Sequence, residues 1–186
     1  NPANGPGGLW TADPGYRWEP NPPGTAAVWT SAPLPADTAV IGAGAVDLWI
    51  QASVPDVDLQ VTVAEVRPDG RETFVQNGWL RSSLRALDRR RSTELEPVLS
   101  LRRRTAAPLP AGRFTKVTVP LYYQGHVYRA GSRLRIAVSA PGGDQPVWAF
   151  AETRPARGTA EVRVAHGPDR PSRVVLPVVP GVSVPT

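Results

Sequence analysis

Apolar and polar residues alternate along several short stretches of the chain, and this alternation predicts β-strands. In residues 133–138, Leu134, Ile136 and Val138 fall on one side of an extended chain, with arginines on the other side near the start. Residues 46–53 alternate in a similar way before Pro55 ends the run. The predicted strands are 26–30, 45–54, 57–67, 72–76, 78–80, 114–123, 127–128, 133–139, 147–150, 161–165 and 173–179.

Turn-forming residues separate these segments. The chain of 186 residues has 22 prolines and 17 glycines, scattered without a period. Pro68, Asp69 and Gly70 predict a hairpin turn between two of the strands. Short strands at such spacing, joined by long crossing connections, are typical of an all-β sandwich and suit a jelly roll.

Two segments depart from the strand pattern. Residues 1–25 are rich in proline and glycine but also hold Trp10, Tyr16 and Trp18, which predicts an extended coil packed on the sandwich. Residues 84–110 hold arginine clusters and prolines, and we interpret them as a long excursion with one helical turn. Residues 26–186 are therefore expected to form a single jelly-roll domain.

Composition narrows the class of protein. Apolar residues make up 41% of the chain, and no run approaches the length of about eighteen that suggests a membrane span, so no membrane partner is expected. The absence of cysteine excludes disulfides, thiolate catalysis and zinc-thiolate sites. The first residues lack the regions of a signal peptide, and the localisation stays unknown between cytoplasm and exterior.

The positive charge is concentrated in one part of the chain. Eight arginines and three acidic residues lie between Arg81 and Arg104, an excess equal to the net charge of +5. No aromatic residue is interleaved with these arginines, although sites that stack single-stranded nucleic acid need one. The pattern favours a solvated loop or a face for an acidic partner domain, and no nucleic-acid partner is expected.

Motifs for nucleotide binding and nucleophilic catalysis are incomplete. Gly42 and Gly44 follow an apolar run, but Asp47 stands where a dinucleotide site needs a third glycine, so a glycine turn feeding a strand is favoured. No serine has the Gly-x-Ser-x-Gly setting, and Ser132 is interpreted as a turn residue. His126 and His166 have no triad or metal spacing. We therefore expect no catalytic residue and no cofactor.

Asp56 and Asp58 are the weak candidates for a metal site. They lie two residues apart on one side of an extended chain, where they could bind calcium or accept backbone N–H groups at a turn. The turn interpretation is favoured.

Several segments together resemble one family, that of the C-terminal non-catalytic domain of X-Pro dipeptidyl-peptidases and cocaine-esterase-like (CocE/NonD) hydrolases. The resemblance is carried by "VWTSAPLPADTAVIGAGAVDLWIQAS", "DVDLQVTVAEVRPDGRETFVQNGWLRSSLR" and "PLPAGRFTKVTVPLYYQGHVYRAGSRLRIAVSAPGGDQPVW", in this order. It covers most of residues 26–148. The basic excursion 89–104 and Tyr128, where phenylalanine is usual, depart from the family pattern.

The resemblance implies a galactose-binding-domain-like jelly roll that belongs to a longer enzyme. In such enzymes an α/β-hydrolase domain supplies serine, aspartate and histidine, and no triad motif of that domain matches this chain. The expected partner is therefore the catalytic domain of the same polypeptide, with a homo-oligomer through the parent enzyme left open. The expected role is to stabilise and shape the active site of a hydrolase acting on ester or amide bonds.

Aromatic and arginine side chains are the candidates for the domain interface, because such residues dominate contact energies. Arg81 could pair with an acid of the hydrolase domain through two parallel hydrogen bonds. An autonomous carbohydrate-binding module is the alternative function, since exposed tryptophans stack on sugars. The candidate interface residues are Trp10, Trp18, Trp49, Trp79 and Arg81.

Overall fold

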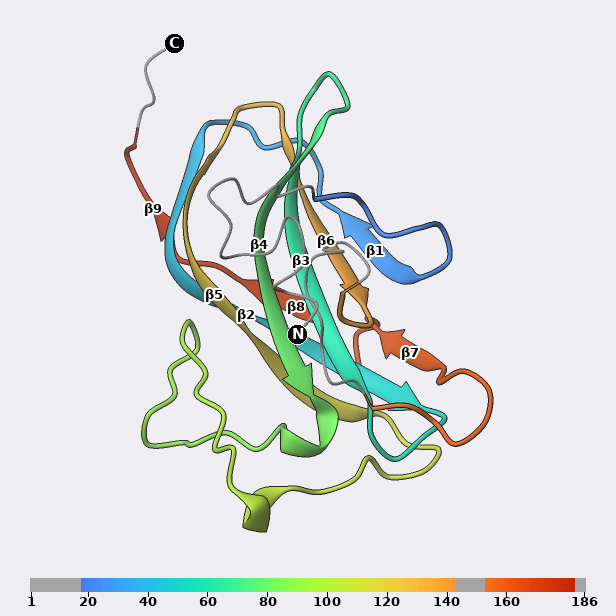
Figure 1. The fold of residues 1–186 in the computed structure, drawn as a ribbon. Helices are drawn as coiled ribbons and strands as arrows, with labels where there is room; N and C mark the ends of the chain where they lie inside the picture. Colours follow the sequence, from blue (N-terminus) through green and yellow to red (C-terminus); the bar gives the residue numbers. More distant parts are fainter. Residues whose placement is uncertain (1–17, 143–152, 183–186) are drawn as a thin grey trace, which may run out of the picture.

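The computed structural model describes residues 18–142 and 153–182 and consists of two antiparallel sheets packed face to face (Figure 1). The first sheet has the order β1-β6-β3-β4, with β1 at Ala26–Thr30, β6 at Arg133–Ser139, β3 at Asp58–Val66 and β4 at Glu72–Arg81. β3 and β4 are joined by a hairpin, whereas β6 lies far in sequence from both of its neighbours, β1 and β3, because the chain crosses between the two sheets. The predicted all-β jelly-roll sandwich is confirmed.

The second sheet is built around β2, which spans Thr38–Ala52. On one side β2 pairs with β5 (Thr115–Tyr128). On its other side three short strands follow one another along β2: β7 (Val162–Ala165), β8 (Arg173–Val175) and β9 (Val178–Val179). Within the described ranges, no helix has the length and apolar character that a membrane crossing requires.

The core lies between the sheets, where alternate side chains of each strand meet. Leu59, Val61 and Val63 of β3 face the buried Val46 and Leu48 of β2 across this core layer. The strands predicted at 26–30 and 133–139 have the observed bounds. Alternation locates the strand at 133–139 because a sheet with one face on the core buries every second side chain.

Two pairs of predicted segments are single strands. Segments 72–76 and 78–80 belong to β4, and segments 114–123 and 127–128 belong to β5. The predicted strand 147–150 lies outside the described residues. The hairpin turn forms as predicted, with Gly70 at φ 82° and its N–H bonded to Arg67 O at 2.9 Å.

The glycine turn predicted at Gly42 and Gly44 is wrong. Both glycines lie inside β2, where the register with β5 shifts between them. Gly42 pairs with Gln124 and Gly44 with Leu121, so Tyr122 and Tyr123 together stand opposite Ala43. This is a β-bulge in β5, which bends a strand without ending it.

The sandwich closes tightly along one side, where β4 runs beside β5 (Figure 1). Gly78 of β4 lies so close to β5 that a Cβ atom there would stand 2.2 Å from Pro120 O. Gln76 Nε2 donates a hydrogen bond to Tyr123 O at 2.6 Å beside this contact. The edges of the two sheets are thereby held together, and the end of β4 is fixed against the bulge in β5.

The excursion after β4 is an ordered loop with two short 3-10 turns, η2 (Ser82–Leu84) and η3 (Arg103–Thr105), where one helical turn was predicted. It lies at the lower left in Figure 1. Its two arms are joined by a bridge between Leu87 and Leu99 and by the hydrogen bond from Ser100 N to Ala86 O. The excursion has its own backbone hydrogen bonds, as ordered loops need.

Candidate domain-docking surface

The bulge in β5 turns two adjacent tyrosines outward. Tyr122 is 57% exposed and Tyr123 is 66% exposed, although a regular strand would bury one of the two. The Tyr122 ring meets the Trp79 ring edge to face, with centroids 5.3 Å apart. The Tyr123 hydroxyl donates to the carboxylate of Glu96 on the excursion. The bulge therefore exposes both tyrosines and places Tyr122 beside a tryptophan of the neighbouring sheet.

Trp79 is half-buried at the end of β4, and its indole is fixed in place. Its Nε1 donates a hydrogen bond to Gln60 Oε1 at 2.9 Å. A cavity of about 270 Å³ opens beside it, and Leu101 at its rim is 65% exposed. The cavity is lined by Asp58, Leu59, Trp79, Leu80, Arg81, Leu84, Leu99, Leu101 and Pro141.

We name this region the Trp79 surface and define it as Trp79, Tyr122, Tyr123, Leu99 and Leu101. Exposed aromatic and aliphatic groups beside a concave site are typical of an interaction surface. Trp79 was predicted from the sequence as an interface residue, whereas the two tyrosines were not. In β5 the buried side chains are at odd-numbered positions before the bulge, such as Val119, and at even-numbered positions after it, such as Tyr128. This shift of the alternation by one residue is the feature of the sequence that marks the two tyrosines.

Arg81 lines the same cavity but makes its two parallel hydrogen bonds within the chain. Its Nε donates to Asp58 Oδ1 at 2.8 Å, and its Nη2 donates to Asp58 Oδ2 at 3.1 Å. Burial raises the pKa of Asp58, but the hydrogen bonds from Arg81 and from Thr153 N outweigh it and hold the pKa below its usual value. The donors expected to bind an acid of the hydrolase domain are thus occupied by Asp58.

Asp56 orders the start of the excursion. Its Oδ1 accepts hydrogen bonds from Ser82 Oγ and Ser83 N, both at 2.7 Å, and its Oδ2 accepts from Ser83 Oγ at 2.6 Å. Asp56 thus accepts a backbone N–H at the turn η2, which is what the turn interpretation expects of this residue. In the part of the chain that the structure describes, no group of three or more metal-ligating side chains comes together.

The other candidate interface residues lie apart from the Trp79 surface. Trp18 packs against Phe74 on the outer face of the first sheet, with ring centroids 6.2 Å apart. Trp49 is half-buried on the outer face of the second sheet, opposite Lys116. Trp10 lies outside the described residues. Of the four candidates within the described residues, the structure brings Trp79 and Arg81 together.

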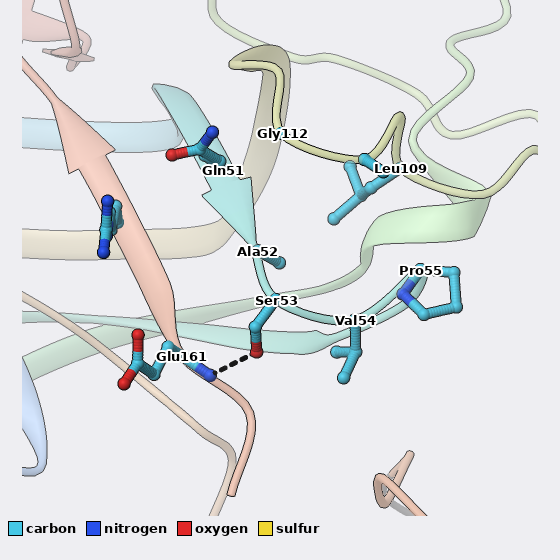
Figure 2. A pocket seen from close by; sticks show the side chains of 10 residues that line it. Gln51, Ala52, Ser53, Val54, Pro55, Leu109, Gly112 and Glu161 are labelled. Carbon is cyan, nitrogen blue, oxygen red and sulfur yellow. Dashed lines mark hydrogen bonds between the residues drawn. The ribbon is translucent and has the colours of Figure 1, made fainter.

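The described residues that line the cavity in Figure 2 include no pair of groups suited to nucleophilic catalysis. It has a volume of about 360 Å³ and lies between the end of β2, the end of the excursion and Glu161 (Figure 2). Ser53 Oγ accepts a hydrogen bond from Glu161 N at 2.9 Å, and no histidine lines the cavity. Among the described residues, its lining also lacks an aromatic side chain on which a sugar could stack.

Comparisons with known proteins identify the domain. The family model of the X-Pro dipeptidyl-peptidase C-terminal non-catalytic domain matches residues 10–175. A protein of Mycobacterium bovis named "Putative serine esterase" is 30% identical over 158 residues, which cover 81% of this chain and 23% of that protein. The chain thus spans about a quarter of the length of this relative.

Solved structures share the fold. A CocE/NonD family hydrolase from Staphylococcus aureus matches with a TM-score of 0.69 at 20% identity, over 83% of this chain and 30% of that one. An alpha-amino acid ester hydrolase matches with a TM-score of 0.61 at 22% identity, over 83% and 26%. From the extent of the family match, this chain belongs to the X-Pro dipeptidyl-peptidase C-terminal non-catalytic domain family.

Proposed function

We propose that this chain is the accessory domain of a serine α/β-hydrolase that acts on ester or amide bonds, and that it stabilises and shapes the active site of the catalytic domain. The observation that carries the proposal is the family match over residues 10–175, joined to a relative named as a serine esterase of which the chain spans 23%. In a protein of that length, most of the chain lies outside the region that matches this domain, and we place the catalytic residues there.

The histidines of this chain support a non-catalytic role. His126 Nε2 donates to the buried carboxylate of Glu65 at 2.9 Å, as expected of a structural histidine. The His166 ring packs edge to face on Trp29, with centroids 6.0 Å apart. Among the described residues, neither histidine is hydrogen-bonded to a serine hydroxyl, the arrangement that activates a serine nucleophile. Acyl transfer is therefore assigned to the catalytic domain.

The Trp79 surface is our candidate for the contact with that domain. Its exposed rings would bury apolar area on docking, and Trp79 is held in one orientation by Gln60, so little side-chain freedom is lost. Trp10, Trp18 and Trp49 remain candidates for further contacts. A contact at the end of the sandwich would position a catalytic loop without supplying a reacting group.

The test compares the catalytic portion of the parent gene alone, mixed with this chain, and fused to it. We expect ester hydrolysis and the unfolding temperature of the catalytic portion to rise when the domain is added. Tyr122→Ala should weaken binding between the two parts about tenfold, because an exposed aromatic anchor is lost. Val178→Ala, which removes an equally exposed apolar side chain from β9, is the matched control and should leave binding unchanged. Hydrolysis by this chain alone would contradict the proposal.

A carbohydrate-binding module is the second candidate, favoured by the pairing of the half-buried Trp79 with the exposed Tyr122. Sugars stack on such rings, so titration with mono- and oligosaccharides should change tryptophan fluorescence, and the change should be lost in Tyr122→Ala. A saturable response that depends on Tyr122, together with no effect on the catalytic portion, would favour this function over the first.

A further inference from the structure

The excursion gathers two runs of arginine on one surface. Its paired arms bring residues 89–91 beside residues 102–104, through the bridge between Leu87 and Leu99. Residues from both runs line a common cavity of about 320 Å³. All six side chains are exposed, and we name them the arginine surface: Arg89, Arg90, Arg91, Arg102, Arg103 and Arg104.

Among the described residues, the acidic side chains of the excursion bond to groups other than these six guanidinium groups. Glu94 pairs with Arg173 at 2.9 Å, and Glu96 accepts from the Tyr123 hydroxyl. Asp88 Oδ1 accepts from the backbone of Arg90 at 3.1 Å. By contrast, Arg129 and Arg135 each pair with an acidic side chain at 3.3 Å. Across residues 18–142 and 153–182, no ion pair involves the arginine surface.

The loop that carries the arginine surface is held rigidly. Arg85 donates hydrogen bonds to Ser82 O at 2.9 Å, Ala107 O at 2.5 Å and Pro108 O at 3.2 Å, which ties the two ends of the excursion together. Leu101 has φ 50°, a conformation that residues other than glycine rarely adopt, and it leads directly into Arg102. Such conformations persist only where the surrounding structure enforces them, so the direction of the second run is fixed.

We propose that the arginine surface binds a cluster of carboxylates on the catalytic domain of the same polypeptide. This inference rests on the proposed function and names the chemistry of the contact. Guanidinium groups match carboxylates by paired hydrogen bonds. The six arginines form no ion pair within the described residues, so their like charges repel one another, and an acidic surface would stabilise them. Leu101 joins the arginine surface to the Trp79 surface, because it lines the Trp79 cavity and adjoins Arg102. The two form one docking face with an apolar centre and a cationic rim.

The choice of partner follows from the chain and its relatives. The chain spans 23% of its curated relative, so a partner attached to it would be present at high effective concentration, and moderate ion pairs would then suffice. Stacking sites for single-stranded nucleic acid interleave aromatic residues with the basic ones, and the two arginine runs contain none. A protein surface rich in aspartate and glutamate is the partner that fits.

The experiment measures binding of this chain to the catalytic portion of its parent at several salt concentrations, and activity of the intact polypeptide. The variant carries Arg102→Ser, Arg103→Ser and Arg104→Ser. We expect binding of the variant to be about tenfold weaker at low salt and to depend less on salt, because exposed ion pairs are screened. The matched control, Arg71→Ser, Arg157→Ser and Arg163→Ser, removes three exposed arginines elsewhere and should bind as the wild type does.

The outcomes separate the two proposals. If the wild-type chain does not bind the catalytic portion at any salt concentration, the proposed function fails. If it binds and the arginine variant binds equally with the same salt dependence, only the present inference is overturned. Binding of an oligonucleotide that is lost in the arginine variant, with binding to the catalytic portion unchanged, would overturn it in favour of nucleic acid. The unfolding midpoint of the variant in urea should equal or exceed that of the wild type, which would show that the weaker binding does not come from misfolding.

Discussion

Gly78→Ala is expected to destabilise the domain by about 3 kcal/mol or more, because β4 and β5 leave no space for a methyl group. The new Cβ atom would lie 2.2 Å from Pro120 O and 3.0 Å from Pro120 C, and these are backbone atoms that cannot rotate away. Relief requires the two sheet edges to separate, which would also strain the bond from Gln76 to Tyr123 O. Urea unfolding of the variant measures the loss.

Gly125→Ala is the matched control. Gly125 lies in β5, and its φ, like that of Gly78, is outside the left-handed region. A Cβ atom at Gly125 would meet no atom within 4 Å. The unfolding free energy of Gly125→Ala should stay within about 0.5 kcal/mol of the wild type. Alanine lowers the entropy of the unfolded chain, which favours a small stabilisation. Equal stability of the two variants would contradict the close contact between β4 and β5.

Local patterns in the sequence predicted most of the strands because burial of alternate residues leaves a direct trace. The strand at 133–139 was placed with the observed bounds on this basis. The bulge left a weaker trace. Glycine at 42 and 44 suggested a turn, whereas the positive φ of Gly42 and the register shift belong to pairing with β5, a strand far away in sequence. A pattern within one segment of the sequence does not reveal which distant strand that segment pairs with.

The candidate site was predicted only in part for the same reason. Trp79 and Arg81 could be proposed from residue type, but the partner of Arg81 is Asp58 on the adjacent strand, which depends on the register of β3 with β4. The exposure of Tyr122 depends on the bulge. The arginine excess was visible in the sequence, whereas its gathering on one surface depends on how the arms of the excursion pair.

Glu65 is the second residue whose replacement should have a large effect, since its side chain is fully buried at one end of the sandwich. Its Oε1 accepts from Arg129 N at 3.0 Å and its Oε2 from His126 Nε2 at 2.9 Å. Glu65→Ala would leave both donors without their acceptor and open a cavity, at a cost of about 3 kcal/mol at pH 7. Glu65→Gln keeps the shape of the side chain and one acceptor oxygen, so a smaller loss of stability, of about 1–2 kcal/mol, is expected.

The pH dependence of Glu65→Gln distinguishes a lost charge from lost packing. Burial raises the pKa of Glu65, but the hydrogen bonds from Arg129 N and His126 are among those that outweigh it, and the folded-state pKa lies below the usual value. The stabilisation is therefore complete above the unfolded pKa of about 4.3 and is lost as the pH falls through the lower folded value. In urea unfolding, the difference in unfolding free energy between the wild type and Glu65→Gln should be smaller at pH 3 than at pH 7. The control Glu161→Gln, at an exposed position, should have an unfolding free energy within about 0.5 kcal/mol of the wild type at both pH values. A gap for Glu65→Gln that is equal at pH 7 and pH 3 would mean that packing, and not the carboxylate charge, sets the contribution of this residue.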